Sequence, residues 1–238
     1  MKYHMIQNLK HLVRSYTGLH PDLFFRLYGV KSKNKKLFVN KKSELVIEGF
    51  PRSGNTFAVV AFQSAQKRNV KIAHHLHVPA QIIRAVNMNI PALVLIRNPS
   101  DSIASLMVRH PHVAPHLAIK DFCRFYSVLL PARDRFVCAD FKTLTTSYAD
   151  VITELNKKFN TTFDLYHDTE ENRKNVFRQI VEINKRVDVG DAHQVAKPDP
   201  KKEKPKLLAQ KTLGSAKFQE GMQQAGKVYK NFLDKCVF

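Results

Sequence analysis

Two short segments of this chain carry residue types whose spacing suggests anion binding. The first covers residues 49–56, reads G-F-P-R-S-G-N-T, and follows an apolar run at residues 45–47. An apolar segment that breaks at glycine and resumes at helical spacing predicts a strand, a tight loop and a helix. The loop N–H groups and the first helical turn then form a cradle for phosphate or sulfate. We expect Gly49 and Gly54 to let the backbone approach the anion.

The cradle differs from a nucleotide-kinase loop at one position. Its spacing is that of the P-loop, G-x-x-x-x-G-K-[ST], but Asn55 replaces the lysine. That lysine reaches the β and γ phosphates beside a metal ion, so its loss argues against ordinary ATP chemistry. Arg52 supplies the positive charge instead, because a guanidinium can bind two oxygens of a phosphate or sulfate without Mg²⁺. The alternative, a glycine-rich loop without a ligand, is disfavoured by the predicted flanking strand and helix.

The second segment begins at Arg97, directly after a continuous apolar run at residues 92–96. Such a run predicts a strand that is buried on both faces. Asn98 can cap the helix that follows, and Asp101 complements its dipole. Ser105 lies two turns beyond Asn98 on the same helical face, which looks back at the strand end. Arg97 and Ser105 therefore predict a second anion site. The alternative is that Arg97 only pairs with Asp101.

Three histidines stand between these segments, in the run H-H-L-H-V-P at residues 74–79, after a predicted strand at residues 70–73. A histidine at the carboxyl end of a parallel strand beside a phosphate loop is well placed to be a general base. We expect His77 to be this base, with His75 as the alternative and His74 in a structural role. Zinc binding by His75 and His77 is disfavoured because no carboxylate or cysteine lies nearby in sequence. No metal site is predicted.

Together these motifs resemble those of the sulfotransferases that depend on 3′-phosphoadenosine-5′-phosphosulfate (PAPS). Residues 51–57, P-R-S-G-N-T-F, resemble the 5′-phosphosulfate loop of that family. Residues 97–105, R-N-P-S-D-S-I-A-S, resemble its 3′-phosphate motif. The run His77-Val78-Pro79 resembles part of the strand-ending K-T-H-L-P that carries the family's base, although the lysine and threonine are absent. The resemblance covers both nucleotide motifs and the histidine between them, in the family's order.

The resemblance implies that a sulfuryl group moves from PAPS to a hydroxyl or amine, that the bisphosphate PAP is the product, and that no metal is required. The implied donor-binding residues are Pro51, Arg52, Ser53, Gly54, Asn55, Thr56, Phe57, Arg97, Ser105 and Lys197. Arg52 would neutralise charge on the bridging oxygen, and Arg97 with Ser105 would bind the 3′-phosphate. Lys197 belongs to a lysine-rich segment that takes the place of the family's closing R-K-G loop.

Length and patterning predict the architecture. The 238 residues can bury one core, and strands are predicted at residues 45–47, 70–73, 91–96 and 135–139. We expect a three-layer α/β fold, P-loop NTPase-like, with a mostly parallel sheet of four to five strands and helices on both faces. The single domain divides into an N-terminal helical region (1–43), an α/β core (44–188), a basic Pro/Lys loop (189–206) and a C-terminal helical region (207–238).

Cysteine content and hydropathy predict a cytoplasmic location. Cys123, Cys138 and Cys236 are an odd set without C-x-x-C spacing, so neither a disulfide framework nor a zinc site is indicated. No apolar run approaches the ~18 residues of a membrane span, and the N-terminus lacks the apolar centre of a signal peptide. The basic N-terminal helices carry apolar residues at helical spacing. We expect these to pack on the core, with contact to an anionic membrane as the alternative.

Two other function classes stay open. A nucleotide or small-molecule kinase with an altered P-loop would bind ATP with Mg²⁺. A non-enzymatic binder of nucleic acid or of a membrane surface would show a steep salt dependence. No nucleic-acid module is recognised, so no nucleic-acid partner is expected. The net charge of +19 draws in anions and would suit a carbohydrate or other anionic acceptor, but the acceptor and the oligomeric state stay unassigned.

Overall fold

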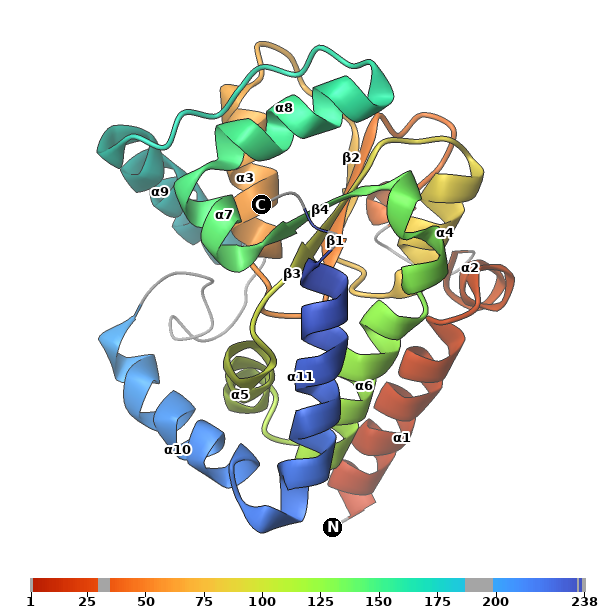
Figure 1. Cartoon of the computed structure of the whole chain (residues 1–238), viewed down its shortest axis with the longest axis vertical. Coiled ribbons are helices and arrows are strands. Elements are labelled where there is room, and N and C mark those ends of the chain that lie inside the picture. Colours follow the sequence, from red (N-terminus) through yellow and green to blue (C-terminus); the bar gives the residue numbers. More distant parts are fainter. Residues whose placement is uncertain (1, 30–34, 187–198, 235, 237–238) are drawn as a thin grey trace.

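The chain is an α/β protein built on a four-stranded parallel sheet with the strand order β2-β1-β3-β4 (Figure 1). The computed structural model describes residues 2–29, 35–186, 199–234 and 236. The strands are β1 (Leu45–Gly49), β2 (Ile72–His74), β3 (Ala92–Ile96) and β4 (Val137–Asp140). Because parallel strands require crossover connections, helices separate them along the chain.

The helices form layers on the two faces of the sheet, as predicted. Their bounds are α1 (Lys2–Thr17), α2 (Pro21–Gly29), α3 (Asn55–Ala65), α4 (Pro79–Asn87), α5 (Pro99–Arg109), α6 (Pro115–Ser127), α7 (Phe141–Thr146), α8 (Tyr148–Phe159), α9 (Glu170–Arg186), α10 (Glu203–Leu213) and α11 (Gln219–Leu233). Helices α3, α8 and α9 cover one face, and α4, α5, α6 and α11 cover the other (Figure 1).

Alternate residues of the central strands enter two separate cores. Ile47 and Leu93 pack into the core under α3 and α8, whereas Val46 and Val94 pack into the core under α5 and α6. All four side chains are completely buried. A strand buried on both faces needs apolar residues at every position, which is why the continuous runs of β1 and β3 predicted these strands well.

The two outer strands begin later than predicted. The second strand was expected at residues 70–73 but covers Ile72–His74, because its register with β1 starts at the pair Leu45 and Ile72. Val70 is buried without belonging to the strand. The fourth was expected at residues 135–139, but a 3₁₀ helix, Leu130–Arg135, precedes it. An apolar run in the sequence indicates which residues are buried. Where a strand begins and ends depends on which residues pair with the neighbouring strand.

The lysine-rich segment ends in helix rather than loop. A 3₁₀ helix, Pro200–Lys202, leads into α10, so the prediction of a loop up to residue 206 is wrong. Helix α10 is held on α5 by polar contacts: Lys206 forms an ion pair with Asp101, and Gln210 donates to the same carboxylate at 3.2 Å. Lys197 lies outside the described residues, and its closing role stays a prediction.

Both N-terminal helices form as predicted, but their apolar residues are not all on the core side. On α1, Leu9 is 62% exposed and Val13 is 46% exposed. Polar contacts attach helix α1 instead. His11 Nε2 lies 2.5 Å from Asp121 Oδ2, and Arg14 donates to the Leu76 carbonyl at 2.7 Å. Core packing of the α1 stripe is therefore a wrong prediction. Membrane contact through this face stays a prediction.

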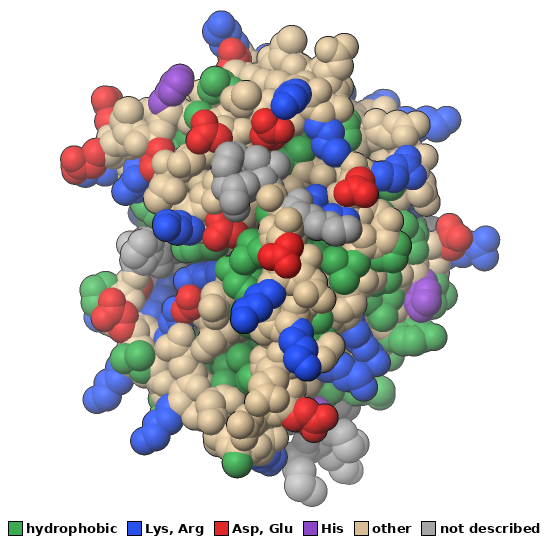
Figure 2. Space-filling model, viewed as in Figure 1, with side chains coloured by type: hydrophobic (Ala, Val, Ile, Leu, Met, Phe, Trp, Pro, Cys, Tyr) green, Lys and Arg blue, Asp and Glu red, His purple; other side chains and the backbone are tan. Residues whose placement is uncertain are grey.

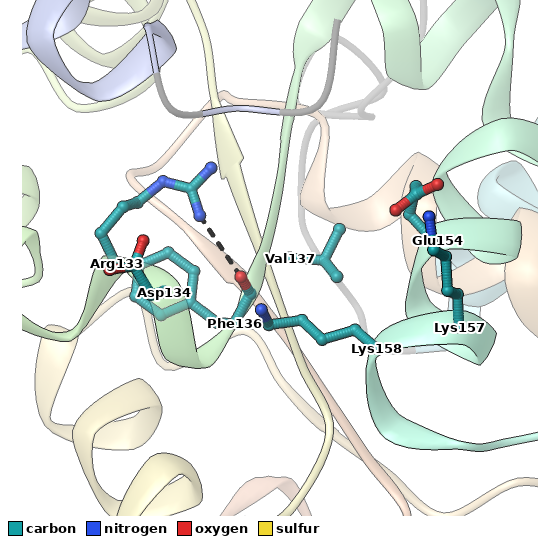
Figure 3. Close-up of a pocket in the computed structure, with 7 residues that line it drawn as sticks. All are labelled: Arg133, Asp134, Phe136, Val137, Glu154, Lys157 and Lys158. Atoms are coloured by element: carbon teal, nitrogen blue, oxygen red, sulfur yellow. Dashed lines mark hydrogen bonds between the residues drawn. The ribbon is translucent and has the colours of Figure 1, made fainter.

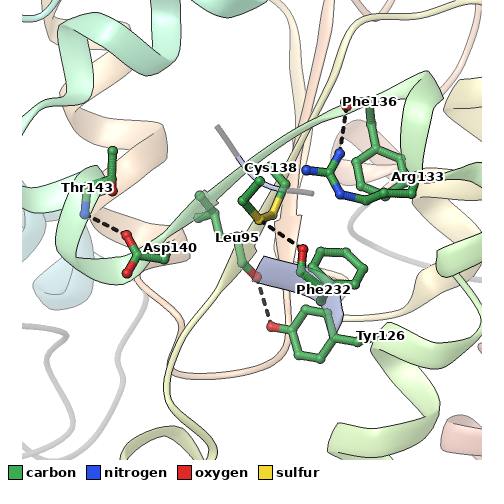
Figure 4. The surroundings of a disulfide bond; sticks show 9 residues. Leu95, Tyr126, Arg133, Phe136, Cys138, Asp140, Thr143 and Phe232 are labelled. Atoms are coloured by element: carbon green, nitrogen blue, oxygen red, sulfur yellow. Dashed lines mark hydrogen bonds between the residues drawn. A yellow bond between two sulfur atoms is a disulfide. The ribbon is translucent and has the colours of Figure 1, made fainter. Parts of the chain in front are cut away.

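A disulfide joins Cys138 of β4 to Cys236, which follows α11 (Figure 4). The cysteines are 98 residues apart in sequence and meet because α11 packs back on the sheet. The expectation that no disulfide forms is wrong, and only Cys123 is free. Disulfides persist in oxidising surroundings, so this bond gives no support to the predicted cytoplasmic location. In the described part of the chain, no helix is both long enough and apolar enough to cross a membrane.

Candidate anion-binding site

The loop between β1 and α3 has the predicted backbone geometry. Gly54 has φ 96° and directly precedes α3, which receives no hydrogen bond from a side-chain cap. The N–H groups of the first helical turn therefore have no capping side chain, and they can bind an anion. Arg52 is also left-handed, with φ 71°, a conformation that non-glycine residues rarely adopt.

Gly49 and Gly54 are each required in the loop, but for different structural reasons. A Cβ atom on Gly49 would lie 2.4 Å from the Leu95 carbonyl oxygen, so the close approach of β3 requires this glycine. Packing alone therefore requires glycine at position 49, and its role in the approach of an anion stays a prediction. Gly54 requires glycine for its left-handed φ and because a Cβ atom would lie 2.7 Å from the Leu144 side chain.

The two predicted anion motifs meet at the carboxyl ends of β1 and β3. Arg52 Nε donates to Ser105 Oγ at 2.9 Å, and Arg97 Nη1 donates to the Arg52 carbonyl oxygen at 3.3 Å. The guanidinium of Arg97 lies 4.0 Å from the ring centroid of Phe141 at the start of α7. Asp101 instead forms its ion pair with Lys206, although its charge still raises the pKa of Arg97 against the larger lowering by burial. The sheet thus brings Arg52, Arg97 and Ser105 into one cluster.

This cluster concentrates positive charge. Burial, followed by the nearby charges of Arg109 and Arg97, lowers the pKa of Arg52 to about 10, so it remains charged at neutral pH. Within the described residues, neither Arg52 nor Arg97 forms an ion pair with a carboxylate, and Arg97 Nε is buried without a hydrogen-bond partner. Buried charge and unpaired donors are costly unless an anion offsets them.

Several predicted loop residues stabilise the loop instead of facing outward. Ser53 Oγ lies 3.3 Å from the Tyr126 hydroxyl, and Asn55 Nδ2 donates to the Phe50 carbonyl at 3.2 Å. Phe57 is buried in the core beneath α3. These side chains hold the loop, so their contribution to an anion is limited to the backbone. Pro51 stands at the start of the loop and is half-buried.

Tyr126 of α6 is a site residue that the sequence reasoning missed. Its hydroxyl donates to the Leu95 carbonyl at 2.8 Å and accepts from the Phe50 N–H at 3.3 Å. The side chain is completely buried, and it connects the loop to β3. Residues 122–126 are rich in aromatic side chains, and nothing in their spacing indicates which ring would reach the loop.

The histidine segment distinguishes His77 from His75. His75 uses both ring nitrogens: Nε2 lies 3.0 Å from Thr56 Oγ1, and Nδ1 lies 2.5 Å from His74 Nδ1. His77 Nδ1 lies 3.0 Å from the Gly49 carbonyl oxygen, which can only accept, so this nitrogen carries the proton. In the neutral ring Nε2 is then the acceptor, and it has no hydrogen-bond partner among the described residues. The geometry favours His77 as a proton acceptor.

All three histidines are neutral at pH 7. Burial lowers the pKa of His74 to about 3, of His75 to about 4 and of His77 to about 3, and the proximity of His75 lowers the first and last further. Neutral rings keep a lone pair available, although a pKa of about 3 makes the His77 ring a weak base at pH 7. Among the described residues, no group of three or more His, Cys, Asp or Glu side chains is arranged to hold a metal ion.

Acid should destabilise the protein through this segment. Between pH 6.5 and the lowered pKa values the unfolded chain binds protons that the folded chain does not, so stability is lost as pH falls. Glu48 acts oppositely, because burial raises its pKa to about 7. The wild-type free energy of unfolding should fall between pH 7 and pH 5. We expect this fall to be smaller in His74→Asn by on the order of 1–2 kcal/mol, as measured by urea unfolding at both pH values. His20→Gln, at an exposed position, is the control. If the free energy of unfolding of His74→Asn depended on pH as steeply as that of the wild type, this assignment would be contradicted.

A pocket of about 410 Å³ lies elsewhere, at the amino end of β4 (Figure 3). Its lining residues are Arg133, Asp134, Phe136, Val137, Glu154, Lys157 and Lys158. Arg133 donates to the Phe136 carbonyl at 3.3 Å. The candidate site lies at the opposite, carboxyl end of the strands, so this pocket does not belong to it.

Comparison of the sequence with models of known protein families and with curated proteins found no match in either.

Proposed function

We propose that this protein is a PAPS-dependent sulfotransferase that acts on a hydroxyl or amine of an acceptor. The contact between the two anion motifs carries this proposal, because Arg52 Nε binds Ser105 Oγ at 2.9 Å and Arg97 binds the Arg52 carbonyl at 3.3 Å. A nucleotide that carries anionic groups on both sides of one ribose needs two such sites next to each other. The motifs are far apart in sequence and are joined through neighbouring strands.

The residues present fit this donor. Arg97 Nε is a buried donor without a partner, and α3 begins without a side-chain cap. When bound, PAPS would supply a sulfuryl group attached to a phosphate leaving group. The α3 N–H groups and Thr56 would bind the 5′-phosphosulfate, and Arg97 with Ser105 would bind the 3′-phosphate.

The chain's own groups suffice for charge stabilisation and proton removal. Arg52 is positioned at the loop and would neutralise negative charge that develops on the leaving oxygen. His77 Nε2 would accept the acceptor's proton, because Nδ1–H is held by the Gly49 carbonyl at 3.0 Å. Thr56 binds His75 at 3.0 Å and thereby connects the loop to the histidine segment.

A thermal-shift comparison of two ligands tests the donor class. We expect PAP without metal to raise the melting temperature, because a ligand at about 100 times its Kd stabilises the folded state by about 2.7 kcal/mol. ATP with Mg²⁺ should have a smaller effect at the same concentration. The reverse order of the two ligands would support the kinase alternative and overturn the proposal.

Loss of Arg97 should weaken recognition of the 3′-phosphate selectively. We expect Arg97→Ala to weaken PAP binding about tenfold or more, because a hydrogen bond to a charged group contributes roughly 1.5–3 kcal/mol. Binding of adenosine 5′-phosphosulfate, which lacks the 3′-phosphate, should change little. Isothermal titration of both ligands measures the difference.

Arg68→Ala is the matched control, because it removes one arginine that forms a surface ion pair with Glu44 at 2.6 Å. An equal loss of PAP affinity in both variants would mean that only net charge matters, as in the nucleic-acid or membrane binder. The face in Figure 2 has Lys and Arg side chains distributed across it with Asp and Glu among them. This distribution does not favour a single binding groove for nucleic acid on that face.

A further inference from the structure

Glu48 is a buried carboxylate that the proposed chemistry leaves without a role. It stands in β1 between Ile47 and Gly49, and it is completely buried. A charged group is rarely found at such a position unless hydrogen bonds compensate its desolvation. Its partners should therefore indicate why the chain keeps a carboxylate there.

Its partners are backbone N–H groups of the histidine segment. Glu48 Oε1 accepts from Leu76 N–H at 2.6 Å, and Oε2 accepts from His77 N–H at 3.0 Å. The two oxygens thus bind two consecutive amides in residues 75–78, which connect β2 to α4 and belong to neither element. Each carboxylate oxygen holds one amide.

This segment has an unusual backbone. His75 has φ 60° and His77 has φ 52°, so two of three consecutive residues are left-handed without being glycine. Such conformations are energetically unfavourable for residues other than glycine and persist only where the surroundings impose them. The bonds to Leu76 and His77 are contacts of this kind.

The next residue of β1 holds the ring of the same histidine. The Gly49 carbonyl accepts from His77 Nδ1 at 3.0 Å, and Glu48 Oε2 lies 3.8 Å from the same nitrogen. Consecutive residues of one strand therefore hold both the backbone and the ring of His77. The His77 side chain is 29% exposed, whereas that of Glu48 is completely buried.

Other residues hold Glu48 in place. Gln81 Nε2 donates to Glu48 Oε1 at 3.0 Å, while Gln81 Oε1 accepts from Val39 N–H at 2.9 Å. This second bond fixes which end of the amide faces the carboxylate. Arg14 donates to the Leu76 carbonyl at 2.7 Å, so Leu76 is bound on both sides of its backbone.

We propose that Glu48 is a positioning residue for the proposed base: its carboxylate holds the Leu76 and His77 amides so that His77 keeps the Nδ1–H tautomer and offers Nε2 to the acceptor. This inference rests on the proposed function, in which His77 is the base. Glu48 does not itself contact the donor site, because its described hydrogen bonds all go to residues 76, 77 and 81.

Glu48→Gln tests the inference, with Glu44→Gln as the matched control. Glu44 precedes the same strand and carries the same group, but it pairs at the surface with Arg68 at 2.6 Å. Each carboxylate oxygen of Glu48 accepts from one backbone N–H, so in Glu48→Gln the side-chain NH₂ that replaces one oxygen faces one of these N–H groups. Two hydrogen-bond donors then oppose each other. We expect ring ¹⁵N NMR of His77 to change from one tautomer to a mixture, and the Leu76 and His77 amides to lose protection from hydrogen exchange.

The kinetic readout separates positioning from binding. We expect the rate of sulfuryl transfer to fall about tenfold or more in Glu48→Gln, because small misplacements of a reacting group cost up to about a hundredfold. PAP affinity should stay within about threefold of wild type, since the Arg52 and Arg97 contacts are untouched. Glu44→Gln should match wild type in both measurements.

Distinct outcomes overturn the inference and the proposed function. A single Nδ1–H tautomer with protected amides in Glu48→Gln would overturn the role of Glu48. Absence of PAP binding by the wild-type protein would overturn the proposed function, while the tautomer result would still report on Glu48. If Glu48→Gln does not fold, hydrogen exchange of the wild type decides: rapid exchange at Leu76 and His77 would show that the carboxylate does not hold them.

Discussion

Replacing Arg52 by alanine should lower the rate of transfer from PAPS at least about a hundredfold, a loss of about 2.7 kcal/mol of transition-state stabilisation. The guanidinium is mostly buried, and its Nε is bound to Ser105 at 2.9 Å. A cation held in this way needs little rearrangement when charge develops on the leaving oxygen. The effect should appear mainly in kcat, because other groups of the loop and Arg97 still bind the donor.

Formation of PAP from PAPS measures this effect before the natural acceptor is identified, with simple phenols, amines or water as acceptors. Arg52→Lys keeps the charge but loses the forked geometry, so we expect an intermediate rate. Arg68→Ala, which removes a surface arginine, should leave the rate unchanged. Unchanged turnover in Arg52→Ala would remove this arginine from the mechanism.

Replacing Cys236 by serine should lower the free energy of unfolding by about 4–5 kcal/mol, because a cross-link that closes a loop of about 100 residues restricts the unfolded chain strongly. The disulfide to Cys138 spans 98 residues. Urea unfolding without reductant measures the difference. Treatment of the wild type with a reductant should lower its stability to that of Cys236→Ser.

Cys123→Ser is the control for this measurement, because Cys123 is free. It should unfold like the wild type, with and without reductant. Equal stabilities of Cys236→Ser and the oxidised wild type would contradict the expectation. The disulfide closes a well-packed region, where the Phe232 ring lies 5.0 Å from the Tyr126 ring and Tyr126 in turn binds the Leu95 carbonyl (Figure 4).

The sequence by itself determined the fold class and the order of the anion motifs. The continuous apolar runs of β1 and β3 predicted strands buried on both faces, and both are central in the sheet. The start of α5 was equally readable, because Asn98 accepts from the Ser100 N–H at 2.9 Å as an N-cap. These features depend on residues close in sequence, whose spacing reports their conformation directly.

Only the tertiary structure decided which groups are left available at the site. His75 and His77 look alike in sequence, but Thr56 and His74 occupy the ring of one while Gly49 fixes the tautomer of the other. The bond between Cys138 and Cys236 and the exposure of the α1 stripe likewise arise between distant segments. The physical reason is that hydrogen-bond partners and burial come from other elements, which a local pattern does not contain.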